Sequence, residues 1–240
     1  MTQKNIAVLT SGGDAPGMNA CIRAVVRVAL SKNMNVWGIK NGYAGMISGD
    51  FIPLNSRLVG NKIHRGGTFL GTLRSEEFKS EEGRKDAFIN LKSRNIDKVV
   101  IIGGDGSLTG SKYLSAEGIS VVGIPGTIDN DIEGTDYTIG FDTAINNVLD
   151  SINKLRDTAS AHGRVMLVEV MGRSSGWIAL IAGIAGGAEF ILVPEIPFDL
   201  ESVCRNLIKS KIEGKQYSIG VIAEGAGSII KIGEYIKKHT

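Results

Sequence analysis

The chain has 240 residues, of which 42% are hydrophobic and 22% are charged, and its formal net charge at pH 7 is +2. This length is enough for one large or two smaller domains with proper cores, and the composition is that of a soluble globular protein. So small a net charge gives no indication of a nucleic-acid-binding or membrane-binding protein. Glycine is the exception in the composition, since it makes up 32 residues.

Cysteine usage and the N-terminal segment both favour a reducing compartment. Cys21 and Cys204 are the two cysteines, and they lie far apart in helix-like segments, where we expect buried free thiols. The first residues, MTQKNIAVLT, are too short and too polar for a signal peptide. Because no apolar run approaches about 18 residues, a membrane span is not expected either. We therefore expect a cytoplasmic protein.

Short apolar runs rich in β-branched residues predict strands, and stretches with helical periodicity lie between several of them. In chain order, the predicted elements are a strand at 6–10, a helix within 17–32, a strand at 35–39, a helix within 81–95, strands at 98–104 and 120–126, a long helix within 137–163, strands at 164–170 and 190–194, a helix within 200–214 and a strand at 218–224. Alternating strands and helices predict parallel sheets with right-handed crossovers. The expected fold class is α/β, with two three-layer α/β/α (Rossmann-like) units that divide at residue 138.

Strands of the first unit end in glycine-rich loops that contain aspartates. The loops are TSGGDAPGMN (10–19), GGDGS (103–107) and PGTIDND (125–131). Because the carboxyl ends of parallel strands lie at one edge of a sheet, we expect the loops to converge on a ligand. Glycine lets backbone amides approach that ligand closely, and a following helix N-terminus favours an anion. The first two loops match neither the Walker A nor the GxGxxG pattern, and each loop alone could be a tight turn.

The aspartates of these loops have several possible roles. Asp105 is a suitable ligand for Mg²⁺, although it could instead be the N-cap of a helix that starts at Ser107. Asp129 and Asp131 would face bound phosphates, where a carboxylate makes sense as a base that takes a proton from an attacking hydroxyl. Asp136 is assigned to turn and cap chemistry for the helix predicted near 138.

Arginines provide the opposite charge. Arg65 and Arg74 lie in the glycine-rich segment HRGGTFLGTLRS, and Arg164 and Arg173 flank a predicted strand. The guanidinium group binds phosphate with two hydrogen bonds, although a single arginine is more commonly a surface residue.

A further pair of arginines occurs within the first predicted helix. Arg23 and Arg27 are four residues apart and repel each other unless an anion lies between them. Simple solvated charges are an equally good interpretation of this pair.

Seven segments in this order closely resemble the ATP-dependent 6-phosphofructokinases of the bacterial type: IAVLTSGGDAPGMNA, RGGTFLGTLR, IGGDGS, PGTIDNDIEGTDYTIGFDTA, LRDTASAHGRV, VEVMGRSSG and IAEG. The resemblance covers essentially the whole chain. It implies transfer of the ATP γ-phosphoryl group to the 1-hydroxyl of fructose 6-phosphate, giving fructose 1,6-bisphosphate in glycolysis. It also implies Mg²⁺, a homotetramer, a nucleotide-binding domain at 1–137 and a sugar-phosphate-binding domain at 138–240.

The resemblance also implies roles for individual residues. MgATP would be held by Gly13, Arg74, Ser75, Gly104, Asp105, Gly106 and Ser107, with Asp105 serving the metal. The sugar phosphate would contact Thr127, Ile128, Asp129, Arg164, Met171, Gly172, Arg173 and Glu224. Catalysis would depend on Asp129 as the base, together with Thr127, Arg173 and Arg74. A nucleotide diphosphate or phosphoenolpyruvate would bind as effector at Arg23, Arg27, Arg156, Glu189 and Lys215.

The sequence departs from the family pattern in two places. Ser56 stands where bacterial members often carry arginine, which affects the expected effector response. Family chains continue past YIKKHT with a segment that contributes a histidine and two arginines to the sugar site, and these 240 residues do not include it. We expect a chain that ends at Thr240 to aggregate or to bind ATP weakly, with little activity.

Two alternatives to the phosphofructokinase function remain open at this point. They are another GGDG-loop kinase, of the NAD or lipid kinase type, and a truncated, non-catalytic nucleotide-binding chain.

Overall fold

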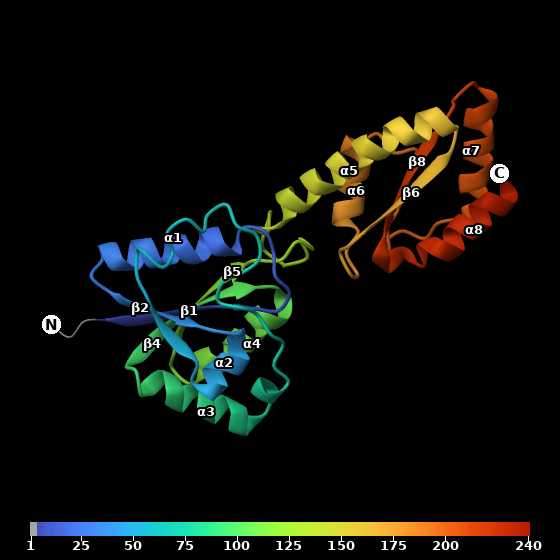
Figure 1. Cartoon of the computed structure of the whole chain (residues 1–240). Helices are drawn as coiled ribbons and strands as arrows, with labels where there is room; N and C mark the ends of the chain where they lie inside the picture. The colour runs from blue at the N-terminus through green and yellow to red at the C-terminus, as the bar shows by residue number, and fades with distance from the viewer. Residues whose placement is uncertain (1–3) are drawn as a thin grey trace. The chain divides into compact units, whose positions relative to one another are not determined.

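The computed structural model describes residues 4–240, which Figure 1 shows from the N-terminus in blue to the C-terminus in red. The chain forms two compact units. The first comprises the chain up to Thr127 together with Ile132–Gly140, and the second comprises Ile128–Asp131 and Phe141–Thr240. The division expected at residue 138 stays a prediction.

The first unit is built on a five-stranded sheet in the order β3-β2-β1-β4-β5. Its strands are β1 (Asn5–Ser11), β2 (Asn35–Ile39), β3 (Phe51–Leu54), β4 (Ile96–Gly103) and β5 (Ser120–Pro125). Neighbouring strands are parallel except β2 and β3, which are antiparallel. The edge strand β3 was not predicted, because it has four residues and contains Pro53, which cannot donate a hydrogen bond to a neighbouring strand.

Helices cover both faces of this sheet. They are α1 (Met18–Ser31), α2 (Gly42–Ser48), α3 (Glu81–Lys92) and α4 (Asp105–Ala116), with a 3₁₀ turn, η1 (Glu77–Lys79). Figure 1 shows α1 on one face and α2, α3 and α4 on the other. The core on the second of these faces joins Leu9 and Ile101 of the sheet to Tyr43, Met46 and Leu91 of the helices. The first unit therefore has the three layers that the sequence predicted.

The second unit has a parallel three-stranded sheet in the order β6-β8-β7. Its strands are β6 (Val165–Val170), β7 (Phe190–Leu192) and β8 (Ser218–Ala223), and its helices are α5 (Phe141–His162), α6 (Trp177–Ala185), α7 (Leu200–Ile212) and α8 (Ile229–His239), with the 3₁₀ turn η2 (Glu224–Ala226). One core cluster joins the sheet to α5 and α6, and another joins it to α7 and α8. This arrangement is again three-layered, so the predicted fold class is confirmed. Within residues 4–240, no helix has both the length and the apolar character needed to span a membrane.

Helix α5 begins later than expected. It starts at Phe141 rather than near 138, because the backbone N–H groups of Ile139 and Gly140 donate to the carbonyls of Pro125 and Thr127 at 3.0 and 3.2 Å. Those bonds tie the end of the loop to the carboxyl end of β5. Asp136 lies five residues before the first helical residue, and its assignment to turn and cap chemistry stays a prediction.

Candidate active site

The three glycine-rich loops of the first unit converge as predicted. They follow β1, β4 and β5, which are adjacent and parallel, so their carboxyl ends lie at one edge of the sheet. The backbone N–H of Gly126 donates to the carbonyl of Gly103 at 2.9 Å. A Cβ added to Gly12 would lie 3.3 Å from Oγ of Ser107, and one added to Gly104 would lie 3.6 Å from Cβ of Thr127. The loops after β1, β4 and β5 are thus in direct contact.

Two helix N-termini at this edge are left without a capping side chain. Helices α1 and α4 start after Gly17 and Gly104, and these N-cap residues have no side chain that could cap the helix. By contrast, Ser80, Asp199 and Ser228 cap α3, α7 and α8 with their side-chain oxygens. The first-turn N–H groups of a helix carry a partial positive charge, so α1 and α4 can bind an anion such as a phosphate.

Asp105 is the first residue of α4, and its side chain is exposed. Its alternative role as N-cap is wrong, because Gly104 occupies that position and its carbonyl accepts from the N–H groups of Ser107 and Leu108 at 3.0 and 3.1 Å. A Cβ added to Gly13 or Gly106 would meet nothing within 4 Å, so both glycines border open space. The loop thus presents one carboxylate beside space for phosphates.

This donor set fits Mg²⁺. The ion takes one or two carboxylates and fills its remaining positions with water or phosphate oxygens. Asp105 can supply one such carboxylate, and its position on the first turn of α4 is next to the anion-binding N–H groups. Nowhere in residues 4–240 do three or more His, Cys, Asp or Glu side chains gather as an all-protein metal site. A Mg²⁺ ion bound here would take phosphate oxygens as well as the carboxylate of Asp105.

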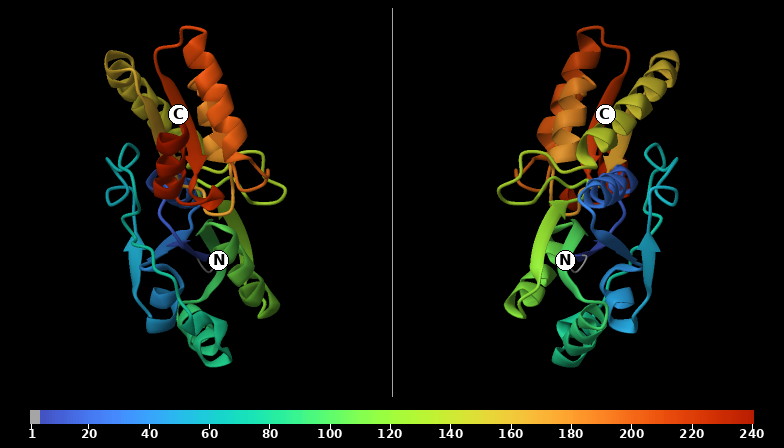
Figure 2. Two further views of the ribbon diagram at one scale, coloured as in Figure 1. Left: turned by 90° about the vertical axis from the view of Figure 1, so that its right-hand side faces the viewer. Right: turned by 90° about the vertical axis from the view of Figure 1, so that its left-hand side faces the viewer.

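The loop that carries Arg65 and Arg74 lies within residues 55–76, which form no helix or strand (Figure 2). Both arginine side chains are exposed. Oγ1 of Thr10, at the end of β1, contacts Oγ1 of Thr68 at 2.8 Å and donates to the carbonyl of Gly71 at 2.9 Å. These bonds hold the arginine-bearing loop beside the loop that follows β1.

Ser75 and Ser107 are further predicted nucleotide-binding residues. Oγ of Ser75 accepts from the N–H of Phe78 at 3.3 Å, at the start of η1. Ser107 is buried, and the hydroxyl of Tyr43 donates to its carbonyl at 2.6 Å. Tyr43 was not predicted as part of the site. A tyrosine in a glycine-containing helix gives no local signal of this bond.

Asp129 belongs to the second unit together with its neighbours Ile128–Asp131. Its side chain is 12% exposed, and Nε of Arg173 lies 3.9 Å from its Oδ2 atom. Oγ of Ser175 donates to the main-chain carbonyl of Asp129 at 2.8 Å. Ile128 packs into the core formed by the sheet, α5 and α6. The turn that presents Asp129 is therefore fixed both by packing and by a hydrogen bond.

The segment after β6 forms a tight turn that the carboxylate of Glu224 supports. Oε1 of Glu224 accepts from the N–H groups of Gly172 and Arg173 at 3.0 and 2.6 Å. Gly172 has φ +141° and Arg173 has φ +52°, and a Cβ on Gly172 would lie 2.4 Å from the carbonyl of Ser175. Glycine is required at 172, and the left-handed arginine stores strain that the Glu224 bonds help to hold. The predicted contact of Glu224 with the sugar stays a prediction.

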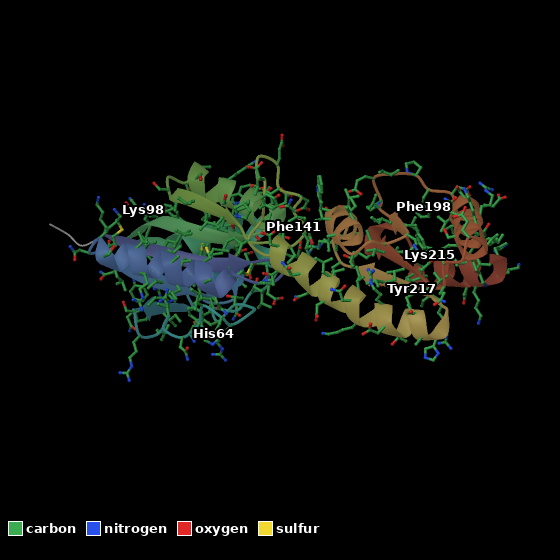
Figure 3. The ribbon with its side chains drawn as sticks, turned by 90° about the horizontal axis from the view of Figure 1, so that it is seen from above. His64, Lys98, Phe141, Phe198, Lys215 and Tyr217 are labelled. Atoms are coloured by element: carbon green, nitrogen blue, oxygen red, sulfur yellow. The ribbon has the colours of Figure 1, made fainter. Side chains whose placement is uncertain are left out.

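Two other predicted sugar-site residues are on the surface. Met171 is 64% exposed, and Arg164 is exposed just before β6. Arg164 lines a surface pocket of the second unit together with Lys211, Lys215 and Tyr217. Figure 3 labels Lys215 and Tyr217, which come from the segment between α7 and β8. A predicted sugar residue and a predicted effector residue thus line the same pocket.

The predicted effector residues are distributed over both units. Lys215 pairs with Glu189, whose carboxylate also accepts from the N–H of Ile219. Arg156 donates to the carbonyl of Gly186. Arg23 and Arg27 lie on α1 in the first unit. The structure therefore brings Glu189 and Lys215 together, and the role of the whole set stays a prediction.

Comparisons with known proteins agree with this arrangement. The sequence profile of the family described as Phosphofructokinase matches residues 5–240. The ATP-dependent 6-phosphofructokinase of Clostridium tetani is 55% identical over 237 residues, which are 99% of this chain and 74% of that relative. The protein of the same name from Clostridium botulinum (strain Hall) is 53% identical over the same shares.

A solved structure gives the same result. Phosphofructokinase from Saccharomyces cerevisiae matches with a TM-score of 0.94 at 36% identity, over 98% of this chain and 36% of that chain. The chain therefore spans about a third of the yeast chain and 74% of the clostridial relatives. From the profile match and the identity to these relatives, it follows that the chain belongs to the phosphofructokinase family.

Proposed function

We propose that Asp129 is the general base of this phosphofructokinase and takes the proton from the 1-hydroxyl of fructose 6-phosphate. The reaction is that of an ATP-dependent 6-phosphofructokinase, a step of glycolysis. The 1-oxygen of the sugar forms a bond to the γ-phosphorus of ATP while the bond between that phosphorus and the departing ADP oxygen breaks. Asp129 accepts the hydroxyl proton, so the products are fructose 1,6-bisphosphate and ADP.

The observation that carries this proposal is the environment of the Asp129 carboxylate. The side chain is largely buried, and the guanidinium of Arg173 is 3.9 Å away, so a positive charge offsets the carboxylate beside an anionic substrate. Ser175 and the packed Ile128 fix the backbone on either side. A base must be held within hydrogen-bond reach of the proton that it abstracts, and a fixed turn meets that requirement.

The nucleotide is assigned to the loops of the first unit. The uncapped N-termini of α1 and α4 bind its phosphates, and Gly13, Gly104 and Gly106 let the backbone approach them. Arg74, Ser75 and Ser107 complete this set, and Asp105 holds Mg²⁺. When bound, the ion offsets negative charge on the phosphate oxygens.

The sugar phosphate is assigned to the loop that carries Thr127 and Asp129 and to the turn that carries Arg173. Thr127 and Asp129 contact the reacting end, and Arg173, in the left-handed turn held by Glu224, binds the phosphoryl oxygens. Met171 extends this surface, whereas Arg164 lies at the other end of β6. Arg164 would contact a sugar bound to a neighbouring subunit of a homotetramer.

Regulation and location are part of the same proposal. An anionic effector, either a nucleoside diphosphate or phosphoenolpyruvate, binds at Arg23, Arg27, Arg156, Glu189 and Lys215. A glycolytic kinase works in the cytoplasm, where its substrates are found.

The test is the variant Asp129→Asn, which keeps the size of the side chain but removes its basicity. We expect kcat for fructose 6-phosphate to fall by about 10²–10⁴-fold while the KM for ATP stays nearly constant. Asp150→Asn is the matched control, because it removes one carboxylate from an exposed position on α5 and should leave kcat unchanged. Near-normal turnover of Asp129→Asn would contradict the proposal.

Acceptor selectivity separates the alternatives. The wild-type protein should phosphorylate fructose 6-phosphate but neither NAD nor diacylglycerol, which other GGDG-loop kinases use. Nucleotide binding without phosphorylation of any of the three would favour a non-catalytic chain. The 55% identity to a protein named ATP-dependent 6-phosphofructokinase over 99% of the chain does not favour these alternatives.

A further inference from the structure

Asn19 is a buried polar residue on a face of α1 whose other buried residues are apolar. It lies in the first turn of α1 and is 4% exposed, next to the buried Met18 and Ile22 on the same helix. Burying an amide side chain costs free energy unless its hydrogen bonds are replaced, so a leucine would serve simple packing better. The bonds that Asn19 makes therefore indicate why an amide is placed here.

The side chain of Asn19 bonds one loop with both ends of its amide group. Nδ2 donates to the carbonyls of Arg65 and Gly66 at 2.9 and 3.0 Å, and Oδ1 accepts from the N–H of Phe69 at 2.8 Å. Both amide hydrogens and the amide oxygen are thus in use. The three partners are backbone groups, so these bonds hold the main chain of the loop and do not depend on the loop's side chains.

The loop has no regular structure to satisfy these backbone groups. Residues 55–76 contain neither helix nor strand, and Asn19 supplies bonds that a neighbouring strand would otherwise provide. A few residues further on, Oγ1 of Thr72 donates to the carbonyl of Gly12 at 2.7 Å. Arg74 follows two residues after that bond. The position of Arg74 relative to the Gly12–Gly13 loop therefore depends on how firmly residues 65–72 are held.

We propose that Asn19 is a positioning residue for the nucleotide site: it fixes the loop 65–72 on α1 and thereby places Arg74 for ATP. This inference rests on the assignment of Arg74 to ATP under the proposed function. Asn19 itself does not contact the nucleotide. Charge-assisted bonds depend strongly on geometry, so a loosened loop weakens the contact of Arg74 with phosphate even though Arg74 is unchanged.

The test variant is Asn19→Leu, which keeps the number and branching of the side-chain heavy atoms and removes all three bonds. We expect the KM for ATP and the dissociation constant of MgATP, measured by calorimetry, to rise about tenfold, with the KM for fructose 6-phosphate nearly constant. Asn19→Asp keeps the acceptor for Phe69 but loses both donors, and it takes the place of Asn19→Leu if that variant fails to fold.

Asn90→Leu is the matched control. Nδ2 of Asn90, on α3, also donates to two successive carbonyls, those of Met46 and Ile47, at 3.2 and 2.7 Å. Asn90→Leu should lower the unfolding temperature about as much as Asn19→Leu does and leave the affinity for MgATP unchanged. If both asparagine variants lower the unfolding temperature and neither changes ATP affinity, the role of Asn19 is only structural and the inference is wrong.

A double-mutant cycle tests whether the effect passes through Arg74. In an Arg74→Ala background, Asn19→Leu should raise the dissociation constant of MgATP by less than twofold, because the contact it positions has already been removed. An undiminished tenfold effect there would overturn the inference. These binding measurements do not need turnover, so a wild-type protein that binds MgATP but leaves fructose 6-phosphate unphosphorylated would contradict the proposed function alone.

Discussion

Nε of Arg173 lies 3.9 Å from Oδ2 of Asp129, yet the Arg173 side chain is 62% exposed and that of Asp129 is 12% exposed. A charge-assisted hydrogen bond between such groups would be about 2.7–2.9 Å long, so this pair is held near contact without closing. Main-chain bonds set the spacing. Ser175 holds the carbonyl of Asp129, and Glu224 holds the N–H of Arg173. The exposed guanidinium thus faces solvent beside a fixed carboxylate.

Glu224 should act through the turn that it supports. Because Oε1 accepts from two backbone N–H groups, Glu224→Gln keeps an acceptor there, whereas Glu224→Ala removes it. We expect Glu224→Ala to raise the KM for fructose 6-phosphate about tenfold or more, and Glu224→Gln to have a much smaller effect. Steady-state kinetics check this. An equal loss in both variants would indicate that the charge of Glu224 contacts the sugar directly.

Tyr43 should support the nucleotide loop through its buried hydroxyl. The hydroxyl donates to the carbonyl of Ser107 at 2.6 Å, and the ring stacks on Phe78 with centroids 4.1 Å apart. Tyr43→Phe keeps the stack but removes this buried hydrogen bond, so the free energy of unfolding should fall by about 0.5–1.5 kcal/mol. Denaturant unfolding measures this fall. Tyr113→Phe, at a site 47% exposed, is the control and should change stability little; an equal fall there would contradict the prediction.

Gly106 should make ATP the preferred donor over pyrophosphate. A Cβ added to Gly106 meets nothing within 4 Å, so Gly106→Asp should fold normally and place its carboxylate in the open space assigned to the inner phosphate of ATP, which pyrophosphate does not have. We expect it to lower kcat/KM for ATP at least about tenfold through charge repulsion, with an unchanged unfolding temperature. Wild-type turnover with pyrophosphate that equals turnover with ATP would refute the assignment.

Arg23 and Arg27 should serve an effector rather than the reaction. They lie one turn apart on α1, and an anion between them would relieve their repulsion. Replacing either with alanine should weaken the response to a nucleoside diphosphate or phosphoenolpyruvate and leave the rate without effector largely intact. Rates across effector concentration check this, with Lys32→Ala at the end of α1 as the control. Loss of the basal rate would instead indicate an effect on folding or assembly.

Stability should fall at high pH as Cys21 ionises. Burial raises the pKa of the Cys21 thiol from 9.0 to about 11, so the folded state favours the protonated form. The stabilisation is fully present below pH 9 and is lost as the pH rises through 11. Burial also raises the pKa of Tyr43, which adds to the fall. Unfolding curves from pH 8 to 11 should show a shallower fall for Cys21→Ala than for wild type, and identical slopes would contradict this.

Much of the fold could be predicted because strands carry a local signal. Each of the seven predicted strands is present, since continuous β-branched runs are typical of buried parallel strands. Helix α6 was missed because its sequence, WIALIAGIA, is apolar all round and has no periodicity. Helix α2, with Gly42 and Gly45 among its seven residues, has a low helix propensity. In both segments, packing against the rest of the fold rather than local sequence stabilises the helix.

The sequence by itself determined the family, the α/β class and the loops that carry Asp105, Asp129 and Arg173, because these depend on residue type and order along the chain. The tertiary structure decided which polar groups meet. It placed Ser175 on the carbonyl of Asp129, Glu224 on the turn of Arg173 and Asn19 on the arginine-bearing loop. Each of these bonds joins residues more than 40 positions apart. No local pattern encodes such a partner, since a buried amide, hydroxyl or carboxylate bonds whatever backbone group the packed core brings within reach.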